Sequence, residues 1–373
     1  MGAEVSKQVK RRKAIDTQKK SLCDLKEKNG CNFPGYDYHV QDRKNWMSTL
    51  APEKLHVSQI VWPVKRRKAI DTQKKSLCDL KEKNGCNFPG YDYHVQDRKN
   101  WMSTLAPEKL HVSQIVWPGT HDSATDEIGI PFISRPFAQC QSLSIYQQLV
   151  TGARVLDIRV QEDRHVCHGI LLCYHVDVVI NDVKKFLSET HSEIIILEIR
   201  TEFGHDDPPD FDKYLEAELG EFLIHQDDNV FNKTIAELLP KRIICIWKPG
   251  KSPQPRQGSP LWSSCYLKDN WIDTDLPEKK FESNMKYLSE QPPVTSRKFF
   301  YRVENTVTPQ SDNPVLWVKP VTERIHPYAR LFIMECISRG YGDRLQIFSS
   351  DFIDEDFVDA CIGLTNARIE GKL

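Results

Sequence analysis

The sequence lacks long apolar runs: no hydrophobic stretch reaches the roughly 18 residues that a transmembrane helix needs. The longest runs, such as Ile194–Leu197 and Ile243–Trp247, have the length of buried strands. The sequence also lacks an excess of charge of one sign, because 51 Lys and Arg face 52 Asp and Glu, for a net charge of -1. We therefore expect no general electrostatic attraction to nucleic acid. With 39% hydrophobic and 28% charged residues, the composition is that of a soluble globular protein.

Paired cysteines are also missing. The 11 cysteines include no Cys-x-x-Cys pair and no zinc-ligand spacing, and the N-terminus lacks the apolar region of a secretory signal. We therefore expect free thiols in a reducing compartment, which indicates a cytoplasmic protein. Cys167 is expected to be a strand residue rather than a nucleophile, because no cysteine-protease signature surrounds it.

The N-terminus, Met-Gly-Ala-Glu-Val-Ser, fits the pattern for N-myristoylation at Gly2. Five basic residues follow it: Lys7, Lys10, Arg11, Arg12 and Lys13. One myristoyl chain binds membranes only marginally, and a basic cluster supplies a second attraction to an anionic leaflet. The pattern predicts peripheral attachment to a membrane. The alternative is a chance match followed by a solvated basic segment.

Residues 9–63 recur letter for letter as residues 64–118. Repeats that build solenoids diverge and number at least about three, so one perfect duplication indicates a recent exon duplication or, as we favour, an error in the gene model. Only the second copy continues into Gly119-Thr120-His121. We expect residues 1–63 to be a loosely packed polar extension, residues 64–110 to be a polar helical lead-in or linker, and residues 111–373 to form one folded domain.

Short apolar segments alternate with helix-like segments after residue 110, which is typical of a parallel sheet with helical crossovers. The expected strands are Ser113–Trp117, Arg154–Val160, His165–His168, Ile194–Arg200, Arg242–Trp247, Phe299–Val303 and Arg344–Phe348. The expected helices are Ser144–Thr151, Asn181–Thr190, Pro209–Gly220, Thr234–Leu238, part of Pro320–Arg339, and Glu355–Glu370. No Gly-x-Gly-x-x-Gly follows the first strand, which argues against a dinucleotide fold. We predict an α/β fold with a distorted TIM-like (β/α) barrel.

Catalytic groups of such barrels lie at the carboxyl ends of several strands. Here those ends carry His121, Asp122, Arg159, His168 and Asp351. One imidazole can remove a proton from an attacking hydroxyl, the other can protonate a leaving oxygen, and a guanidinium can stabilise charge on a phosphorus centre. These residue types suit phosphodiester cleavage, although their spacing alone does not show that they converge. Six other histidines of this region are expected to be structural: His111, His175, His191, His205, His225 and His326.

Three motifs carry a resemblance to a known family. Trp117-Pro-Gly-Thr-His-Asp-Ser123, Gly152-Ala-Arg-Val-Leu-Asp-Ile-Arg159 and Cys167-His-Gly169 occur in this order. They resemble the X domain of phosphatidylinositol-specific phospholipases C, above all the small X-domain-containing proteins and their bacterial relatives. The resemblance spans about residues 111–365. It implies cleavage of phosphatidylinositol to diacylglycerol and an inositol 1,2-cyclic phosphate.

The resemblance also implies a role for each residue. His121 matches the general base that activates the inositol 2-hydroxyl, and Asp351 is similar to the carboxylate that orients it. His168 matches the general acid that protonates the diacylglycerol oxygen, and Asp122 resembles its supporting aspartate. Arg159 matches the arginine that neutralises the phosphate. In a weaker match, three further positions resemble residues that contact or wall the inositol: Lys248, Asp269 and Trp271.

No metal and no cofactor are expected. Calcium-dependent members of the resembled family use acidic and amide ligands at this site, whereas Arg159 stands here where a calcium-binding carboxylate would be needed. Asp157 and Glu198 could suggest a calcium site, because hard cations prefer several oxygen ligands. An ion-pair network of both carboxylates with Arg159 is the favoured interpretation.

Two other functions stay open. The chain could be a membrane-anchored interaction protein with a degenerate barrel, or another barrel phosphodiesterase such as a glycerophosphodiesterase, which would rely on a metal. The sequence does not decide between phosphatidylinositol and its phosphorylated forms. Lys248 and Lys251 could favour the latter, but a solvated loop is the simpler interpretation. No protein partner can be inferred.

Overall fold

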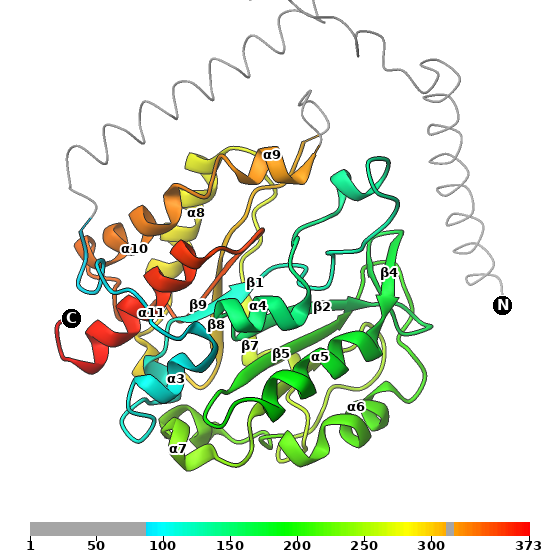
Figure 1. Ribbon diagram of the computed structural model, residues 1–373, viewed down its shortest axis with the longest axis horizontal. Helices are drawn as coiled ribbons and strands as arrows, with labels where there is room; N and C mark the ends of the chain where they lie inside the picture. The colour runs from blue at the N-terminus through cyan, green and yellow to red at the C-terminus, as the bar shows by residue number, and fades with distance from the viewer. Residues whose placement is uncertain (1–86, 311–316) are drawn as a thin grey trace, which may run out of the picture. The chain divides into compact units, whose positions relative to one another are not determined.

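The computed structural model describes residues 87–310 and 317–373. The expectations for Gly2, for the basic cluster, for the first copy of the repeat and for residues 64–86 lie outside these residues. In the described part of the chain, nine strands form one curled sheet with helices on its outer side (Figure 1). No helix of this part is both long and apolar enough to cross a membrane. The predicted α/β, TIM-like fold is confirmed.

The elements follow the alternation expected from the sequence. The strands are β1 Trp117–Thr120, β2 Val155–Val160, β3 His165–His168, β4 Leu171–His175, β5 Ile195–Thr201, β6 Ile243–Lys248, β7 Leu267–Asp269, β8 Phe300–Asn305 and β9 Ile347–Ser350. The helices are α3 Trp101–Thr104, α4 Ile145–Thr151, α5 Val176–Ser188, α6 Phe211–Leu219, α7 Ile235–Leu238, α8 Pro277–Ser289, α9 Val318–Thr322, α10 Tyr328–Ser338 and α11 Glu355–Ile369.

Seven parallel strands build the barrel wall in the order β6-β5-β2-β1-β9-β8-β7. The antiparallel hairpin of β3 and β4 extends from the end of β2. In the described residues β6 and β7 share no ladder, so the barrel keeps one open seam. Lys248 Nζ donates to the carbonyl of Leu267 across this seam, at 3.0 Å. The sheet is therefore curled like a barrel without being closed by hydrogen bonds all round.

Local sequence explains how several elements begin and end. Helix α4 starts at a capping box, in which Ser144 and Gln147 each satisfy the backbone N–H of the other. It ends at Gly152, whose φ of 115° is a conformation that other residues rarely adopt. Strands β5 and β6 are buried almost throughout, as expected of parallel strands with both faces covered.

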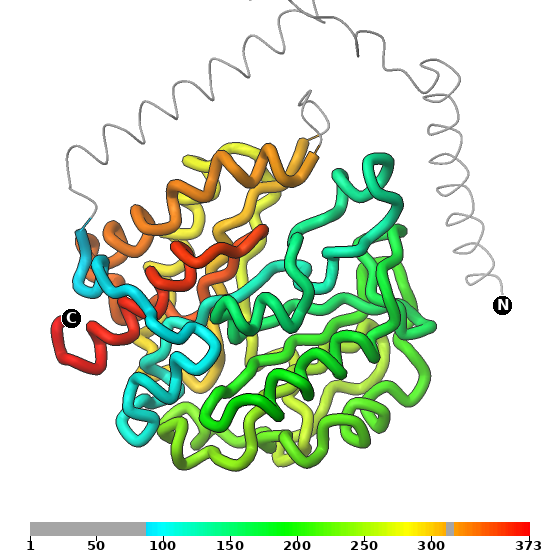
Figure 2. Tube along the Cα trace, in the orientation of Figure 1, coloured from blue at the N-terminus to red at the C-terminus, as the bar shows by residue number. Residues whose placement is uncertain are grey.

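The packed fold begins earlier than the expected boundary at residue 111. Trp101, Met102 and Leu110 are fully buried in the main core. Arg98 forms a two-pronged ion pair with Asp359 of α11 at 2.8 and 2.9 Å. Figure 2 shows this early segment running beside the C-terminal helix. The expectation of a polar lead-in through residue 110 is thus wrong for residues 87–110, because several of their apolar side chains are buried in the main core.

Three elements escaped the sequence pattern and one was misplaced. The first strand begins at Trp117 rather than at Ser113, because Val112–Gln114 form a 3-10 turn. Strand β4, Leu-Leu-Cys-Tyr-His, shows no alternation of polar and apolar residues, and strand β7 is too short to show one. Helix α8 was missed because its mostly polar surface hides a narrow buried stripe.

Candidate active site

The five strand-end residues come together because their strands are neighbours. Strand β1 pairs in parallel with both β2 and β9, and Thr120 lies opposite Ser350 in the register. His121 and Asp122 leave the end of β1, and Asp351 leaves the end of β9 at the same level. Arg159 extends from β2, and His168 ends β3. All five side chains meet at one edge of the sheet.

His121 is held on both ring nitrogens. Its Nδ1 lies 2.8 Å from Asp351 Oδ1, and its Nε2 lies 2.7 Å from Arg159 Nη2. A guanidinium can only donate hydrogen bonds, so Nε2 must accept. In this arrangement the imidazole is therefore neutral, with its proton on Nδ1 facing Asp351.

The surroundings of His121 favour its charged form. Burial opposes a charge on the ring, but the carboxylates of Asp351 and Asp122 outweigh this effect and raise the pKa of His121 from 6.5 to about 9. The hydrogen bond from Arg159 Nη2 to Nε2 can form only while the His121 ring is deprotonated. Because two N–H donors repel, taking up a proton at Nε2 requires the guanidinium to move away.

This coupling gives a first prediction. Asp351→Asn should lower the pKa of His121 markedly, because the largest favourable charge is removed while burial, which disfavours the imidazolium, remains. The measurement is an NMR titration of the His121 ring protons. Asp354→Asn serves as a control, since Asp354 is exposed and caps α11. Equal His121 pKa values in the Asp351→Asn variant and the parent would contradict the assignment.

His168 is the second imidazole. Its Nδ1 lies 2.9 Å from the carbonyl oxygen of Ala138 and 3.5 Å from Asp122 Oδ2. The carbonyl is therefore its direct hydrogen-bond acceptor, and Asp122 supports the ring mainly through its charge. The His168 side chain is more exposed than that of His121. A group leaving toward solvent would meet His168 rather than His121.

Arg159 is surrounded by carboxylates. Its Nε lies 2.6 Å from Asp122 Oδ1, its Nη2 lies 3.3 Å from Asp157 Oδ2, and its Nη1 lies 3.8 Å from Glu202 Oε2. Burial opposes the charge, yet Asp122 and Asp157 hold the pKa of Arg159 well above its usual value. The expected network with Asp157 is present.

Glu198, in contrast, is not part of the Arg159 network, which corrects the sequence-based expectation. Glu198 pairs with Lys248 at 2.8 Å and with Arg302 at 2.5 Å. Arg302 also contacts Asp269 at 2.7 Å and Glu304 at 2.9 Å. Lys248 and Asp269, which resemble inositol-contacting positions, are thus joined through Glu198 and Arg302 inside the barrel. Trp271 instead stacks on the His121 ring, with centroids 5.3 Å apart and planes 23° from parallel.

Sequence reasoning missed Arg302 and Gln141. Arg302 and Glu304 alternate along β8, which the period of two in a strand could have indicated. Gln141 lies in a loop and gave no signal. Its buried amide donates to the carbonyls of His121 at 3.0 Å and Ser350 at 2.9 Å, and it accepts from Ile353 N at 3.1 Å. One side chain thereby ties the end of β1 to the end of β9.

Two overlapping groups could offer ligand atoms to a metal: His121, Cys140 and Asp351, and Asp122, Cys140 and His168. The guanidinium of Arg159 already contacts His121 Nε2 and Asp122. A cation placed here would meet that positive charge at close range. Burial also raises the pKa of the Cys140 thiol well above its usual value, so the thiolate that binds metals is disfavoured. The residues fit a fixed guanidinium better than a metal ion.

Burial similarly raises the pKa of the Cys167 thiol, which supports its interpretation as a strand residue rather than a nucleophile.

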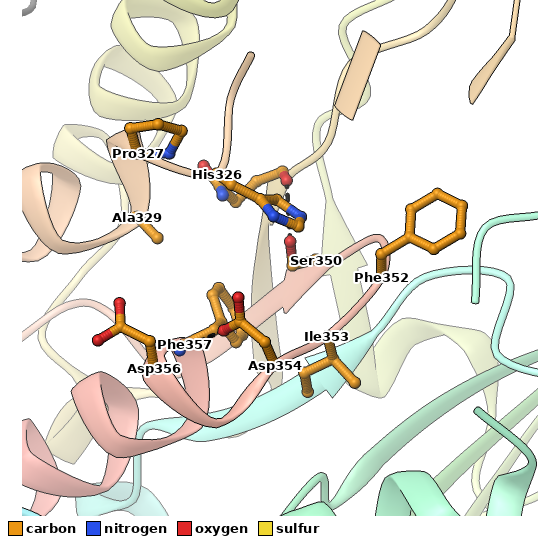
Figure 3. Close-up of a pocket in the computed structure, with 10 residues that line it drawn as sticks. His326, Pro327, Ala329, Ser350, Phe352, Ile353, Asp354, Asp356 and Phe357 are labelled. Atoms are coloured by element: carbon orange, nitrogen blue, oxygen red, sulfur yellow. Dashed lines mark hydrogen bonds between the residues drawn. The ribbon is translucent and has the colours of Figure 1, made fainter. Parts of the chain in front are cut away.

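A cavity of about 190 Å³ lies between the end of β9 and the first turns of α10 and α11. Figure 3 shows the His326 ring beside Ser350, while Phe352 extends away from them. One His326 ring nitrogen, Nε2, donates to the backbone carbonyl of Asp351 at 2.8 Å. The contact supports a structural role for His326, which fixes the turn after β9.

Comparison with known proteins identifies related chains. Residues 117–248 match the family model described as phosphatidylinositol-specific phospholipase C, X domain. A 1-phosphatidylinositol phosphodiesterase of Listeria monocytogenes is 34% identical over 115 residues, covering 30% of this chain and 36% of that protein. A PI-PLC X-box domain-containing protein of Dictyostelium discoideum is 26% identical over 227 residues, covering 53% of this chain and 30% of that protein. The chain thus spans about a third of the length of these curated relatives.

Solved structures of bacterial phosphatidylinositol-specific phospholipases C share the fold. The Listeria monocytogenes structure gives a TM-score of 0.58 at 18% identity, covering 72% of this chain and 98% of that one. A single-site mutant of the Staphylococcus aureus enzyme gives a TM-score of 0.56 at 21% identity, covering 73% of this chain and 98% of that one. Residues 117–248 are thus similar to the X domain of phosphatidylinositol-specific phospholipases C, and the described residues share the fold of the bacterial members of that family.

Proposed function

We propose that this chain is a phosphoric diester hydrolase that cleaves phosphatidylinositol to diacylglycerol and inositol 1,2-cyclic phosphate without a metal. The observation that carries the proposal is the contact between the Nε2 of His121 and the guanidinium of Arg159, with His168 beside the same Asp122 carboxylate. A base, an acid and a phosphate-binding cation thus share one small space.

In the first step, the deprotonated form of His121 takes the proton of the inositol 2-hydroxyl at Nε2, and that oxygen forms a bond to phosphorus. Asp351 stabilises the imidazolium that results, through Nδ1. The bond from phosphorus to the glycerol oxygen breaks, and protonated His168 gives this oxygen its proton. Arg159 turns from His121 to the non-bridging oxygens of the phosphate, where its planar fork can donate two hydrogen bonds. Water can open the cyclic product by the reverse roles of the two histidines.

The barrel interior favours a headgroup without ring phosphates. Lys248 and Arg302 are each paired with carboxylates, supplied by Glu198, Asp269 and Glu304. Inositol hydroxyls can donate to such carboxylates and accept from such cations. A ring phosphate would meet the carboxylates as well, and like charges repel at short range. We therefore expect phosphatidylinositol to be cleaved in preference to its 4,5-bisphosphate.

The test is mass spectrometry of the products from phosphatidylinositol vesicles in the presence of EDTA. A cyclic inositol phosphate should appear, at a rate that added calcium leaves nearly unchanged. Bisphosphorylated vesicles should react more slowly. Loss of activity in chelator with recovery in calcium would contradict the metal-free site, and release of a glycerophosphoinositol would indicate a different phosphodiesterase.

Exposed apolar side chains surround the proposed site. They lie in β4 or in the segments that follow β1, β3, β5, β7 and β8, and we call them the rim: Ile130, Phe132, Ile133, Phe137, Ile170, Leu172, Phe203, Trp271 and Trp317. Phe132 is 95% and Phe203 is 97% exposed. Hydrogen bonds link the rim segments, from Gly129 N to the Leu172 carbonyl and between His205 and the Gly169 carbonyl, both at 2.9 Å. Linked apolar surface of this kind is typical of a membrane contact.

We expect the rim to act only when the substrate lies in a bilayer. Replacing both Phe132 and Phe203 with Ser should lower the rate on vesicles about tenfold or more, since each buried Phe contributes ~1.5–3 kcal/mol. The rate on a short-chain, monomeric phosphatidylinositol should change little. Leu373→Ser is a matched control, because Leu373 is exposed after α11 and outside the rim. Equal losses on both substrates would show that the phenylalanines serve the site itself. An acylated, basic N-terminus would add a second membrane attachment and remains a proposal.

A further inference from the structure

Lys280 is a buried cation for which the proposed chemistry has no use. It lies in α8, its side chain is fully buried, and its Nζ is 4.1 Å from the centre of the Trp271 ring. The same Nζ donates to the carbonyl of Ile272 at 3.2 Å. From these contacts we propose that Lys280 is a positioning residue, which acts on His121 by holding Trp271 against its ring. The inference deepens the proposed function, since it rests on His121 being the base.

Trp271 needs such a support because it lies on a connecting segment. Residues 270–276 join β7 to α8, and Trp271 is 45% exposed. Its neighbours are fixed on both sides: Tyr301 donates to the Asn270 side chain at 2.7 Å, and Lys280 holds Ile272. The backbone is thereby set, while the indole itself depends on ring contacts. The contacts of the indole include the His121 ring on one side and the ammonium of Lys280.

The energetics favour this role for a lysine. Burial lowers the pKa of Lys280, whereas the charges of Glu304 and Asp351 act to raise it. A buried ammonium is costly unless it finds compensating partners. The negative face of an indole is one such partner, and this attraction is strongest where water is excluded. Lys280 therefore ties α8 to Trp271, and Trp271 in turn shields one face of His121 from bulk water.

The inference can be tested without activity. The chain has eight tryptophans, so the fluorescence of Trp271 must be isolated. The parent and each Lys280 variant are therefore measured with and without the additional substitution Trp271→Phe, and the difference within each pair is the signal of Trp271. Acrylamide quenching of this difference reports how accessible the indole is. We expect Lys280→Met to raise quenching strongly, because losing a desolvated cation–π contact shifts the docked state by about tenfold or more. Lys280→Arg, which keeps a cation, should stay close to the parent.

A further variant separates the charge from the hydrogen bond. Lys280→Gln keeps a donor for the Ile272 carbonyl but carries no charge, and we expect it to resemble Lys280→Met. Circular dichroism and thermal melts identify any variant that fails to fold. Parent-like quenching in folded Lys280→Gln or Lys280→Met would overturn the proposal, as would a Trp271 that is freely quenched in the parent.

Kinetics on phosphatidylinositol then connect the contact to the site. If the parent is active, Lys280→Gln should lower kcat/KM while Lys280→Arg restores it. If the parent proves inactive, the proposed function fails, whereas the quenching result still decides whether Lys280 positions Trp271.

Discussion

Replacing His121 with Asn is expected to lower kcat for phosphatidylinositol cleavage by about 10²- to 10⁴-fold, the usual contribution of a positioned general base. Asn has a similar reach and can still donate to Asp351, so the fold should be retained. It has no basic nitrogen at the position of Nε2, which faces Arg159 at 2.7 Å. The measurement is initial-rate kinetics on vesicles, with thermal melts to confirm folding.

His165→Asn is the matched control, because His165 lies three residues before His168 in the same strand and pairs with Asp163 at 3.2 Å, away from the site. We expect it to retain parent-like activity. Cleavage by His121→Asn within a few fold of the parent would remove the basis for the mechanism. A parent without activity, in contrast, would favour the membrane-anchored interaction protein that the sequence left open.

The largest expected effect on stability comes from Arg154, far from the chemistry. Its fully buried guanidinium contacts Glu193 at 2.5 and 2.9 Å. It also donates to the carbonyl of Leu149 at 2.8 Å and to that of Lys99 at 2.8 Å. Arg154→Met should lower the free energy of unfolding by about 3–5 kcal/mol, because it leaves the Glu193 carboxylate buried without its charge partner. Urea denaturation followed by circular dichroism measures this loss.

A double variant tests the explanation. Adding Glu193→Gln to Arg154→Met removes the unpaired charge, so part of the stability should return. A single-variant loss below about 1 kcal/mol would show that the pair is dispensable. In that case the early segment, whose Lys99 carbonyl accepts from Arg154, would have to be held by its apolar contacts instead, such as those of Trp101 and Met102.

The side chain of Arg154 also ties part of the second copy of the repeat to the fold, through the Lys99 carbonyl. Residues 87–118 of the second copy pack against β2 and α11 through Arg98, Trp101 and the carbonyl that Arg154 binds. The first copy has the same letters but no direct continuation into β1. Composition marked the second copy as polar, so it could not reveal that a few apolar residues between positions 87 and 110 pack into the main core.

The sequence by itself determined the barrel and the identity of the strand-end residues. Alternating apolar segments indicated the parallel strands, and the motifs around His121, Arg159 and His168 carried the family resemblance. Because the carboxyl ends of parallel strands meet at one edge, those residues had to come close once the strand order was known.

Only the tertiary structure decided which partners these residues have. Asp351 reaches His121 across 230 positions of the chain, and Gln141 reaches Ile353 across 212. Glu198 pairs with Arg302 instead of Arg159, and Lys280 lies against Trp271. Local patterns record whether a side chain faces the core, but not which distant charge or carbonyl completes its hydrogen bonds. That choice depends on strand register and on the paths of loops, which are fixed only when the whole barrel packs.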